Sequence, residues 1–202
     1  MKEYAILGGG GMALEIADLM LSEGEKICGY YSPDENATLS SLIPYLGDER
    51  NNFNSKFDYI IASGVIPIRK KMIDFIEYNN LQVGNFISKQ ARISSLITFG
   101  KGILIAPFAT VGRVISIGDY VYVNAYASIA HGVRIGNNVV VNVGARITGE
   151  CTIGNNVLLG ANSALVPGTV LEDDVEIGIL TYPPRKVKAE RFILSEPGRA
   201  LR

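Results

Sequence analysis

One repeat dominates this chain: every sixth residue from position 87 to position 177 carries a large apolar side chain, at sixteen consecutive positions. These anchor residues are Ile87, Ile93, Phe99, Ile105, Val111, Ile117, Val123, Ile129, Ile135, Val141, Ile147, Ile153, Leu159, Leu165, Leu171 and Ile177. Amphipathic helices repeat apolar residues near every 3.6 positions and half-buried strands near every second position, so neither fits a period of six. The period is typical of a parallel β-helix built from six-residue rungs.

A second signature accompanies the anchors, because the fourth residue after most of them is small or aliphatic. These residues are Ile97, Ile103, Ala109, Ile115, Val121, Ala127, Val133, Val139, Ala145, Cys151 and Val157. We therefore expect two inward side chains per rung. Three rungs that close a triangular coil would stack residues eighteen apart in the sequence, separated by one strand spacing of roughly 4.8 Å.

Length and charge limit the partners of the chain. Its 202 residues are enough for two domains with real cores, and its net charge of −1 gives no field that would attract nucleic acid or an anionic membrane. No apolar run approaches the roughly 20 residues that span a bilayer, and the N-terminus does not resemble a signal peptide. We expect a cytoplasmic protein with neither a nucleic-acid nor a membrane partner.

The first 86 residues lack the sixfold repeat and alternate strand and helix patterns instead. This alternation predicts a βαβ opening and a Rossmann-like α/β domain. Residues 32–55 are rich in Asn, Ser, Asp and Pro, which favours an irregular segment with at most a short helix. The expected elements are strands at 4–7, 26–31, 57–62 and 83–87 and helices at 12–22 and 67–78.

A glycine run separates the first expected strand from the first helix, and its members are Gly8, Gly9, Gly10 and Gly11. Backbone N–H groups at such a turn and at a helix N-terminus can hold a phosphate group. The second strand, however, ends at residues 29–32 without the acidic residue that would bind the ribose of NAD. Two interpretations stay open: a site for a nucleotide or nucleotide sugar, or merely a tight turn.

His131 is the only histidine in the chain, and it lies two positions after the anchor Ile129, near a corner of the coil and pointing outward. It is either an ordinary surface residue or a general base. Stacking by eighteen residues puts Gly149 directly above the imidazole, leaving an open N–H and room for a substrate. The stacking favours the general base.

A neighbouring column offers amide side chains to a polar ligand. It consists of Ala106, Asn124, Asn142, Gly160 and Gly178. An asparagine ladder at a β-helix corner is equally a structural device, so both interpretations of this column stay open.

Three segments, added to the βαβ domain and its glycine loop, carry a resemblance to a known family. They are residues 123–136 (VNAYASIAHGVRIG), residues 68–71 (IRKK) and residues 86–94 (FISKQARIS). Over nearly its whole length the chain resembles the NeuD/PglD-type family of sugar acetyltransferases. The resemblance implies a homotrimer of left-handed β-helices with acetyl-CoA in the groove between subunits.

Carried over residue by residue, the resemblance implies that His131 takes the proton of the acceptor amine or hydroxyl as it attacks the thioester. The Gly149 N–H would receive the developing oxyanion. Asn124 would contact the acceptor, and the loop of Gly8 to Gly11 its nucleotide or sugar. The residues implied to contact acetyl-CoA are Asn142, Gly149, Gly160 and Ala161, and no metal is implied.

The expected function is N-acetylation of a nucleotide-linked amino sugar, namely a UDP-linked 4-amino-dideoxy sugar used in surface glycan biosynthesis. O-acetylation of a sialic acid and a non-catalytic scaffold that binds sugar nucleotides stay open. A zinc hydratase is disfavoured, because such a site needs about three histidines and the chain has one. Family members flank the catalytic histidine with acidic residues where this chain has Ala130 and Gly132, so we expect Asn142 or Glu150 of an adjacent subunit to orient it.

These interpretations divide the chain into three parts. Residues 1–86 would form a Rossmann-like domain that binds the nucleotide sugar, residues 87–180 the β-helix acyltransferase domain, and residues 181–202 a C-terminal tail. Pro183 and Pro184 should end the coils, since proline cannot donate to a parallel ladder. The basic side chains of the tail would be solvated or would approach the phosphates of CoA.

Overall fold

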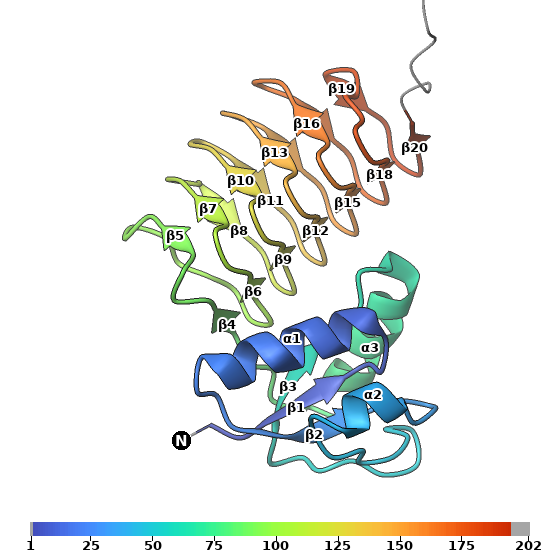
Figure 1. Ribbon diagram of the computed structural model, residues 1–202. Helices are drawn as coiled ribbons and strands as arrows, with labels where there is room; N and C mark the ends of the chain where they lie inside the picture. The colour runs from blue at the N-terminus through green and yellow to red at the C-terminus, as the bar shows by residue number, and fades with distance from the viewer. Residues whose placement is uncertain (1, 195–202) are drawn as a thin grey trace, which may run out of the picture. The chain divides into compact units, whose positions relative to one another are not determined.

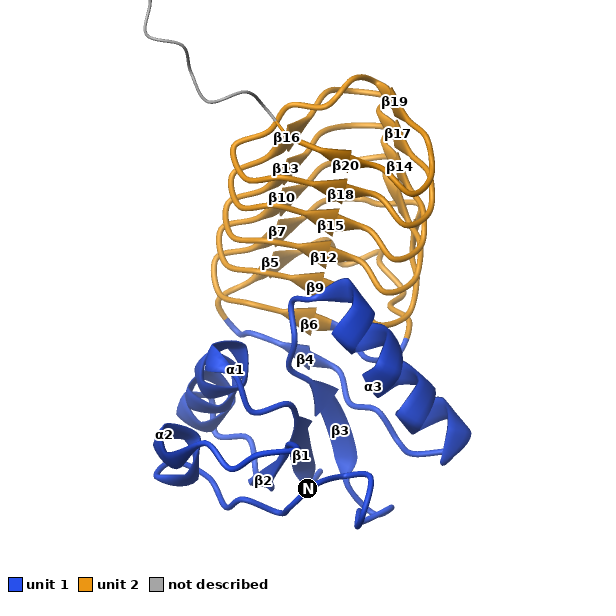
Figure 2. Ribbon diagram, turned by 90° about the vertical axis from the view of Figure 1, so that its right-hand side faces the viewer, with its two compact units in different colours: residues 1–89, 101–103 blue, residues 90–100, 104–202 orange. Residues whose placement is uncertain are grey.

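The computed structural model describes residues 2–194, which form two compact units (Figures 1 and 2). Within the described residues, the first unit comprises residues 2–89 and 101–103, and the second comprises residues 90–100 and 104–194. The first is an α/β unit, and the second is built from the sixfold repeat.

The first unit contains a three-stranded parallel sheet in the order β2-β1-β3. Its elements are β1 (Tyr4–Leu7), α1 (Gly11–Ser22), β2 (Ile27–Tyr31), α2 (Ala37–Ser40), β3 (Asp58–Ile61), α3 (Ile66–Tyr78) and β4 (Phe86–Ile87). Leu7 lies opposite both Tyr31 and Ile61, so the three strands end at one edge of the sheet. The glycine loop begins at that edge. The βαβ prediction is confirmed.

Apolar periodicity explains these elements. Strand β1 is apolar and buried at every position, as expected for a parallel strand covered on both faces. Helix α1 buries Ala13, Ile16, Ala17 and Met20, which share one face at helical spacing. Pro67 stands in the first turn of α3, where its missing N–H has no intrahelical partner to lose. No helix within residues 2–194 is long and apolar enough to cross a membrane, and α3, the longest, has 13 residues.

The second unit is a parallel β-helix with three stacks of two-residue strands (Figure 2). One stack, from the N-terminal side, is β5 (Arg92–Ile93), β7 (Thr110–Val111), β10 (Ser128–Ile129), β13 (Arg146–Ile147) and β16 (Ala164–Leu165). The next is β8 (Ser116–Ile117), β11 (Arg134–Ile135), β14 (Thr152–Ile153), β17 (Val170–Leu171) and β19 (Lys186–Val187). Within this unit the third is β6 (Leu104–Ile105), β9 (Tyr122–Val123), β12 (Val140–Val141), β15 (Leu158–Leu159), β18 (Glu176–Ile177) and β20 (Phe192–Ile193).

The stacking by eighteen residues is confirmed. Ser128 pairs with Arg146 and with Thr110, and Ile129 pairs with Ile147 and Val111. The anchors from Ile105 onward are buried, and so are most of the predicted second inward residues. Apolar side chains therefore fill the coil from one end to the other, which explains why the sequence has so strict a register.

One predicted inward residue points outward. Ile115 is 56% exposed, while its neighbour Val114 is buried. The Val114 N–H donates to the Gly112 carbonyl at 2.9 Å, and at this tight turn the inward position falls one residue earlier, at Val114 instead of Ile115. The prediction for Ile115 is therefore wrong, because the corner geometry and not the period decides which side chain enters the core.

The glycines that follow several anchors are explained by the close approach of successive coils. A Cβ at Gly118 would lie 2.7 Å from the carbonyl carbon of Gly136, and a Cβ at Gly136 would lie 2.7 Å from the Gly154 oxygen. Only glycine fits at these corners, although none of the three has a left-handed backbone conformation.

The prediction that Pro183 and Pro184 end the coils is wrong. Strands β19 and β20 continue two of the stacks, with Lys186 opposite Val170 and Phe192 opposite Glu176. The pairing distance falls from eighteen residues to sixteen there, so the prolines lie in a shortened corner where no ladder hydrogen bond is needed from them. Residues 195–202 of the predicted tail lie outside the described residues.

Candidate active site

His131 lies at the corner that follows β10, with its imidazole over Gly149 of the next coil. A Cβ at Gly149 would lie 2.8 Å from the imidazole Cε1, 3.0 Å from Nε2 and 3.4 Å from Nδ1. The space that any other side chain would fill is thus taken by the ring. Stacking by eighteen residues places the imidazole against Gly149, as the sequence predicts, but the room expected there for a substrate is filled by the ring itself.

The Gly149 N–H is a free donor next to this ring. The Gly149 carbonyl accepts from the Gly168 N–H at 3.0 Å, whereas the Gly149 N–H donates to no acceptor within residues 2–194. The neighbouring Glu150 N–H is already used, since it donates to the His131 carbonyl at 3.0 Å. A basic nitrogen and an unused backbone donor therefore lie side by side, which is the pair of groups that acyl transfer needs.

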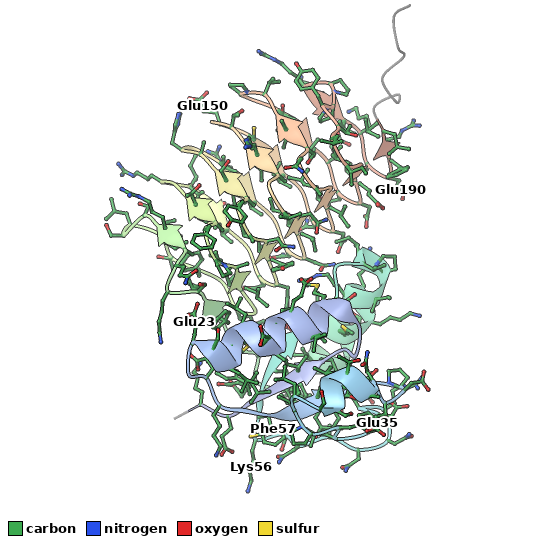
Figure 3. The ribbon with its side chains drawn as sticks, in the orientation of Figure 1. Glu23, Glu35, Lys56, Phe57, Glu150 and Glu190 are labelled. Carbon is green, nitrogen blue, oxygen red and sulfur yellow. The ribbon has the colours of Figure 1, made fainter. Side chains whose placement is uncertain are left out.

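The imidazole itself is exposed, and neither of its nitrogens has a hydrogen-bond partner in the part of the chain that the structure describes. One carboxylate reaches this corner from the next coil, because Cγ of Glu150 lies 3.2 Å from the position of a Gly132 Cβ. Figure 3 places Glu150 at the outer edge of the coils. An acidic group is thus available beside His131 within the same chain, one coil beyond Gly132.

The residues expected to contact acetyl-CoA lie mostly along another corner, which follows β9, β12 and β15. Asn142, Gly160 and Ala161 line one groove of 340 Å³ there. The remaining lining is largely apolar and includes Leu158, Ile177, Ile179, Phe192 and Leu194. An apolar groove with an amide at its edge matches the mixed character of a pantetheine arm.

Asn124 lies in the same column, one coil below Asn142. Its Oδ1 accepts the Ala125 N–H, at 2.6 Å, so part of this amide serves the local turn. The Asn142 side chain makes no hydrogen bond within residues 2–194, which leaves it open to a ligand. The two asparagines therefore differ, and only Asn142 has both polar ends unused.

The predicted site residues of the β-helix thus occupy two separate corners of one coil. His131 and Gly149 follow β10 and β13, whereas Asn124, Asn142, Gly160 and Ala161 follow β9, β12 and β15. One flat face of the triangle separates the two groups. A single chain does not bring the predicted base and the predicted cofactor groove together.

In the first unit, the glycine loop combines two structural glycines with two open ones. Gly8 has φ +129°, and a Cβ there would lie 2.7 Å from the Ala62 oxygen, while a Cβ at Gly9 would lie 2.5 Å from Ser32 Oγ. Added Cβ atoms at Gly10 and Gly11 would meet no described atom within 4 Å. The first pair lets the loop pack against the sheet edge, and the second pair leaves the start of α1 accessible.

Asn36 holds this loop in place, although the sequence analysis missed it. Its Nδ2 donates to the Gly9 carbonyl at 2.8 Å, and its Oδ1 accepts the N–H groups of Thr38 and Leu39 at the start of α2. Asparagine is a preferred helix N-cap, so Asn36 could have been found in the sequence as the residue that begins the short helix expected within residues 32–55. Helix α1 has no side-chain cap and no acidic residue in its first turn, so its N-terminal N–H groups are available to a polar ligand.

No three His, Cys, Asp or Glu side chains in residues 2–194 lie together in an arrangement that could hold a metal ion.

Comparison with known families matches both units. Residues 3–76 match the PglD N-terminal domain, and residues 114–149 match the bacterial transferase hexapeptide (six repeats), which includes both His131 and Gly149. These two matches confirm the resemblance to the NeuD/PglD-type family of sugar acetyltransferases that the sequence predicts. The chain is accordingly an acyltransferase by family, with a PglD-type N-terminal unit before its hexapeptide coils.

Several solved structures share this fold over nearly the whole chain. The acetyltransferase domain of PglB from Neisseria gonorrhoeae FA1090 superposes with a TM-score of 0.84 at 20% identity, covering 100% of both chains. WeeI from Acinetobacter baumannii AYE gives a TM-score of 0.84 at 19% identity, also over 100% of both chains. Perosamine N-acetyltransferase from Caulobacter crescentus gives 0.69 at 17% identity, over 96% of this chain and 94% of that one. At these identities the likeness shows the fold.

Proposed function

We propose that this protein is an acetyl-CoA-dependent N-acetyltransferase whose acceptor is a nucleotide-linked amino sugar. The observation that carries the proposal is the exposed His131 imidazole stacked on Gly149, with the free Gly149 N–H beside it. Two neighbours support the substrates: the PglB acetyltransferase domain is known in complex with acetyl coenzyme A, and the Caulobacter enzyme in complex with CoA and GDP-perosamine. We expect it to act in the cytoplasm, where acetyl-CoA is available.

In the proposed reaction His131 acts as the general base. It accepts a proton from the acceptor amine while the amine nitrogen forms a bond to the thioester carbonyl carbon. The Gly149 N–H donates to the carbonyl oxygen as negative charge develops there. The carbon–sulfur bond then breaks and CoA leaves, taking up a proton. Direct transfer between two bound substrates requires positioning more than any covalent intermediate.

The proposed site needs a second copy of the chain, because the two predicted groups occupy different corners. We propose a homotrimer in which the His131 corner of one copy meets the Asn142 corner of another, with acetyl-CoA between them. Exposed apolar side chains on the Asn142 corner support this arrangement. Phe108 and Tyr126 stack at 5.1 Å and are 51% and 63% exposed, and Leu180 in the same column is 71% exposed. The Phe108–Tyr126 pair is an exposed aromatic patch, separated from Leu180 by Gly144 and Asn162 in this column, and such a patch suits a subunit contact.

The first unit would bind the nucleoside of the acceptor. The Gly10 and Gly11 N–H groups donate to no acceptor within residues 2–194, and Ser32 lies beside Gly9, so these donors would bind oxygen atoms of the ribose or the base. Ser32 follows β2, at the position where proteins that bind NAD have an acidic residue for the ribose. A serine hydroxyl can both donate and accept a hydrogen bond, whereas a carboxylate can only accept. We expect the base to be uracil, and the acceptor panel below distinguishes uracil from guanine and thymine.

The direct test of the function is release of free CoA from acetyl-CoA in the presence of single acceptors. The panel contains UDP-, GDP- and dTDP-linked 4-amino sugars, together with sialic acid to test transfer to a hydroxyl. We expect turnover with one class of nucleotide-linked amino sugar and not with its N-acetylated form. Turnover with sialic acid alone would replace N-acetylation with O-acetylation. Acetyl-CoA that binds but is never consumed with any acceptor would favour a scaffold.

A mixing experiment tests the shared site. His131→Ala removes the base, and Ala161→Trp fills the groove on the other corner, so each variant alone should be inactive. When the two are unfolded together and refolded, some trimers pair an intact His131 corner with an intact groove. We expect activity to return in the mixture. A mixture as inactive as its components would contradict a site built from two copies.

A further inference from the structure

A second cavity of the β-helix lies on the His131 side of the coils and contains none of the predicted site residues. Its volume is 350 Å³, and we call it the Arg92 pocket after its charged residue. Its lining consists of Arg92, Ile93, Ser94, Ser95, Thr110, Val111 and Gly112. It therefore combines one guanidinium and three hydroxyl groups with a glycine backbone, and it contains no carboxylate.

The polar groups of this pocket are unused within the protein. Arg92 forms no ion pair or side-chain hydrogen bond within residues 2–194, and the same holds for the hydroxyls of Ser94, Ser95 and Thr110. The Ser94 N–H, by contrast, donates to the Val111 carbonyl at 2.9 Å, so the backbone of the pocket is fixed by the ladder. A rigid wall that presents one planar cation and three hydroxyl donors suits the oxygens of an anionic ligand.

The surrounding surface has the same sign. The coils carry four exposed arginines on this corner and its two adjoining faces, namely Arg92, Arg113, Arg134 and Arg146. None of them is paired with a carboxylate in the described part of the chain. The column that stacks with His131 contains no acidic residue, and the neighbouring column of Gly132 contains one, Glu150. An otherwise slightly acidic chain has thus gathered uncompensated positive charge around its base.

Position along the coils identifies which substrate this charge serves. Gly149, the oxyanion donor, and the apolar groove at Gly160 lie in coils after His131, which puts acetyl-CoA on the C-terminal side of the base. The Arg92 pocket lies in the two coils before it, since Ser95, Arg113 and His131 follow one another at intervals of eighteen residues. One to two strand spacings, roughly 5–10 Å, separate the pocket from the imidazole. A hexose ring can span that interval.

We propose that the Arg92 pocket binds the diphosphate of the acceptor, with Arg92 paired to its phosphate oxygens and the hydroxyls of Ser94, Ser95 and Thr110 donating to them. This assignment rests on the proposed function for the identity of the ligand. The sugar amine would then lie at His131, while the diphosphate occupies the pocket below. Arg92 is a specificity residue in this arrangement, because it selects acceptors that carry a diphosphate over free sugars.

Calorimetric titration with inorganic pyrophosphate tests the pocket without any acceptor. It is carried out on the full chain at low ionic strength, because salt screens exposed charges. Arg92→Gln should weaken pyrophosphate binding about tenfold, the effect of one charge-assisted pair. The matched control Arg134→Gln removes another exposed and unpaired arginine, outside the pocket, and should change pyrophosphate binding less than about twofold. Acetyl-CoA binding should be unchanged in both variants.

Three results would overturn the assignment: no binding of pyrophosphate to the wild type, an equal loss in the two variants, or a loss of acetyl-CoA binding in Arg92→Gln. The last would assign the pocket to the phosphates of CoA. The readout is independent of turnover. If pyrophosphate binding depends on Arg92 but the protein acetylates no acceptor, the anion site is supported and the transferase function is refuted. If acetyl transfer is efficient and Arg92→Gln leaves the KM for the acceptor unchanged, the transferase function stands and the anion site is refuted.

Discussion

A single methyl group added at Gly149 should disable the base without unfolding the protein. In Gly149→Ala the new Cβ would lie 2.8 Å from the His131 Cε1, whereas carbon atoms in contact prefer about 3.5–4.0 Å. The ring must therefore move by roughly 0.7–1.2 Å. A misplacement of about 1 Å costs on the order of a hundredfold in rate, or about 2.7 kcal/mol of transition-state stabilisation.

The backbone tolerates this change. Gly149 is not among the glycines with a left-handed conformation, and the clash involves an exposed side chain that can swing toward solvent. We expect the melting temperature to change by only a few degrees while kcat/KM falls about a hundredfold. The Gly149→Ala protein keeps the N–H at this position, so the loss reports on the imidazole and not on the oxyanion donor.

A double-mutant cycle with His131→Ala isolates the mechanism. If Gly149→Ala acts by displacing the imidazole, it should cost little once the imidazole is absent, and the two losses should be far from additive. The rates are measured as CoA release at saturating and limiting acceptor. Full activity in Gly149→Ala, or two losses that simply add, would refute the stacked arrangement as the source of catalysis.

Three further predictions address the scaffold. Tyr126→Asp places a charge in the exposed aromatic pair on the Asn142 corner, and aspartate tolerates the left-handed backbone at this position (φ 59°). Light scattering should show smaller assemblies for this variant. An unchanged mass would contradict the proposed contact. Gly8→Ala should destabilise the first unit by about 2 kcal/mol, because φ is +129° and the Cβ would lie 2.7 Å from a carbonyl oxygen, whereas the control Gly11→Ala should be close to neutral in denaturant melts. The hydrogen bond from Lys188 lowers the pKa of Glu172 below 4.5, so its stabilising effect is complete above pH 4.5 and is lost as the pH falls through the folded value. Hydrogen-exchange protection factors at β19, which are corrected for the intrinsic pH dependence of exchange, should then fall on acidification in the wild type, and Lys188→Gln should remove that fall.

The coils could be located from the sequence because each anchor marks one buried position, and so strict a register admits a single stacking. The same stacking predicted that Gly149 lies over His131, since residues eighteen apart must meet whatever their types. Side chains at irregular corners were less accessible. The Val114 turn exchanged the roles of two residues, and Pro183 fitted a shortened last coil, because hydrogen bonding at a corner is set by local turns that the period does not encode.

Three features of the site could not be predicted from the sequence: the sharing of the site between copies, the Arg92 pocket and the role of Asn36. The separation of His131 and Asn142 on two corners follows from counting rungs, yet its consequence, a site shared between copies, becomes clear only when the intervening face is seen. Arg92 lies within the segment at residues 86–94 that carries part of the family resemblance, but the resemblance gives it no role, and its place in a pocket depends on the stacking of β5 on β7. Asn36 was recognisable only through the helix it caps.

The most direct test of the account compares the wild type with His131→Ala, using the acceptor that the panel identifies and following both CoA release and the acetylated product. The account predicts one acetyl group on the sugar amine per CoA released, with a rate at least on the order of a hundredfold lower in the variant while both proteins bind acetyl-CoA equally. Unchanged turnover in His131→Ala would show that the reaction has another base and would contradict the site proposed at this corner.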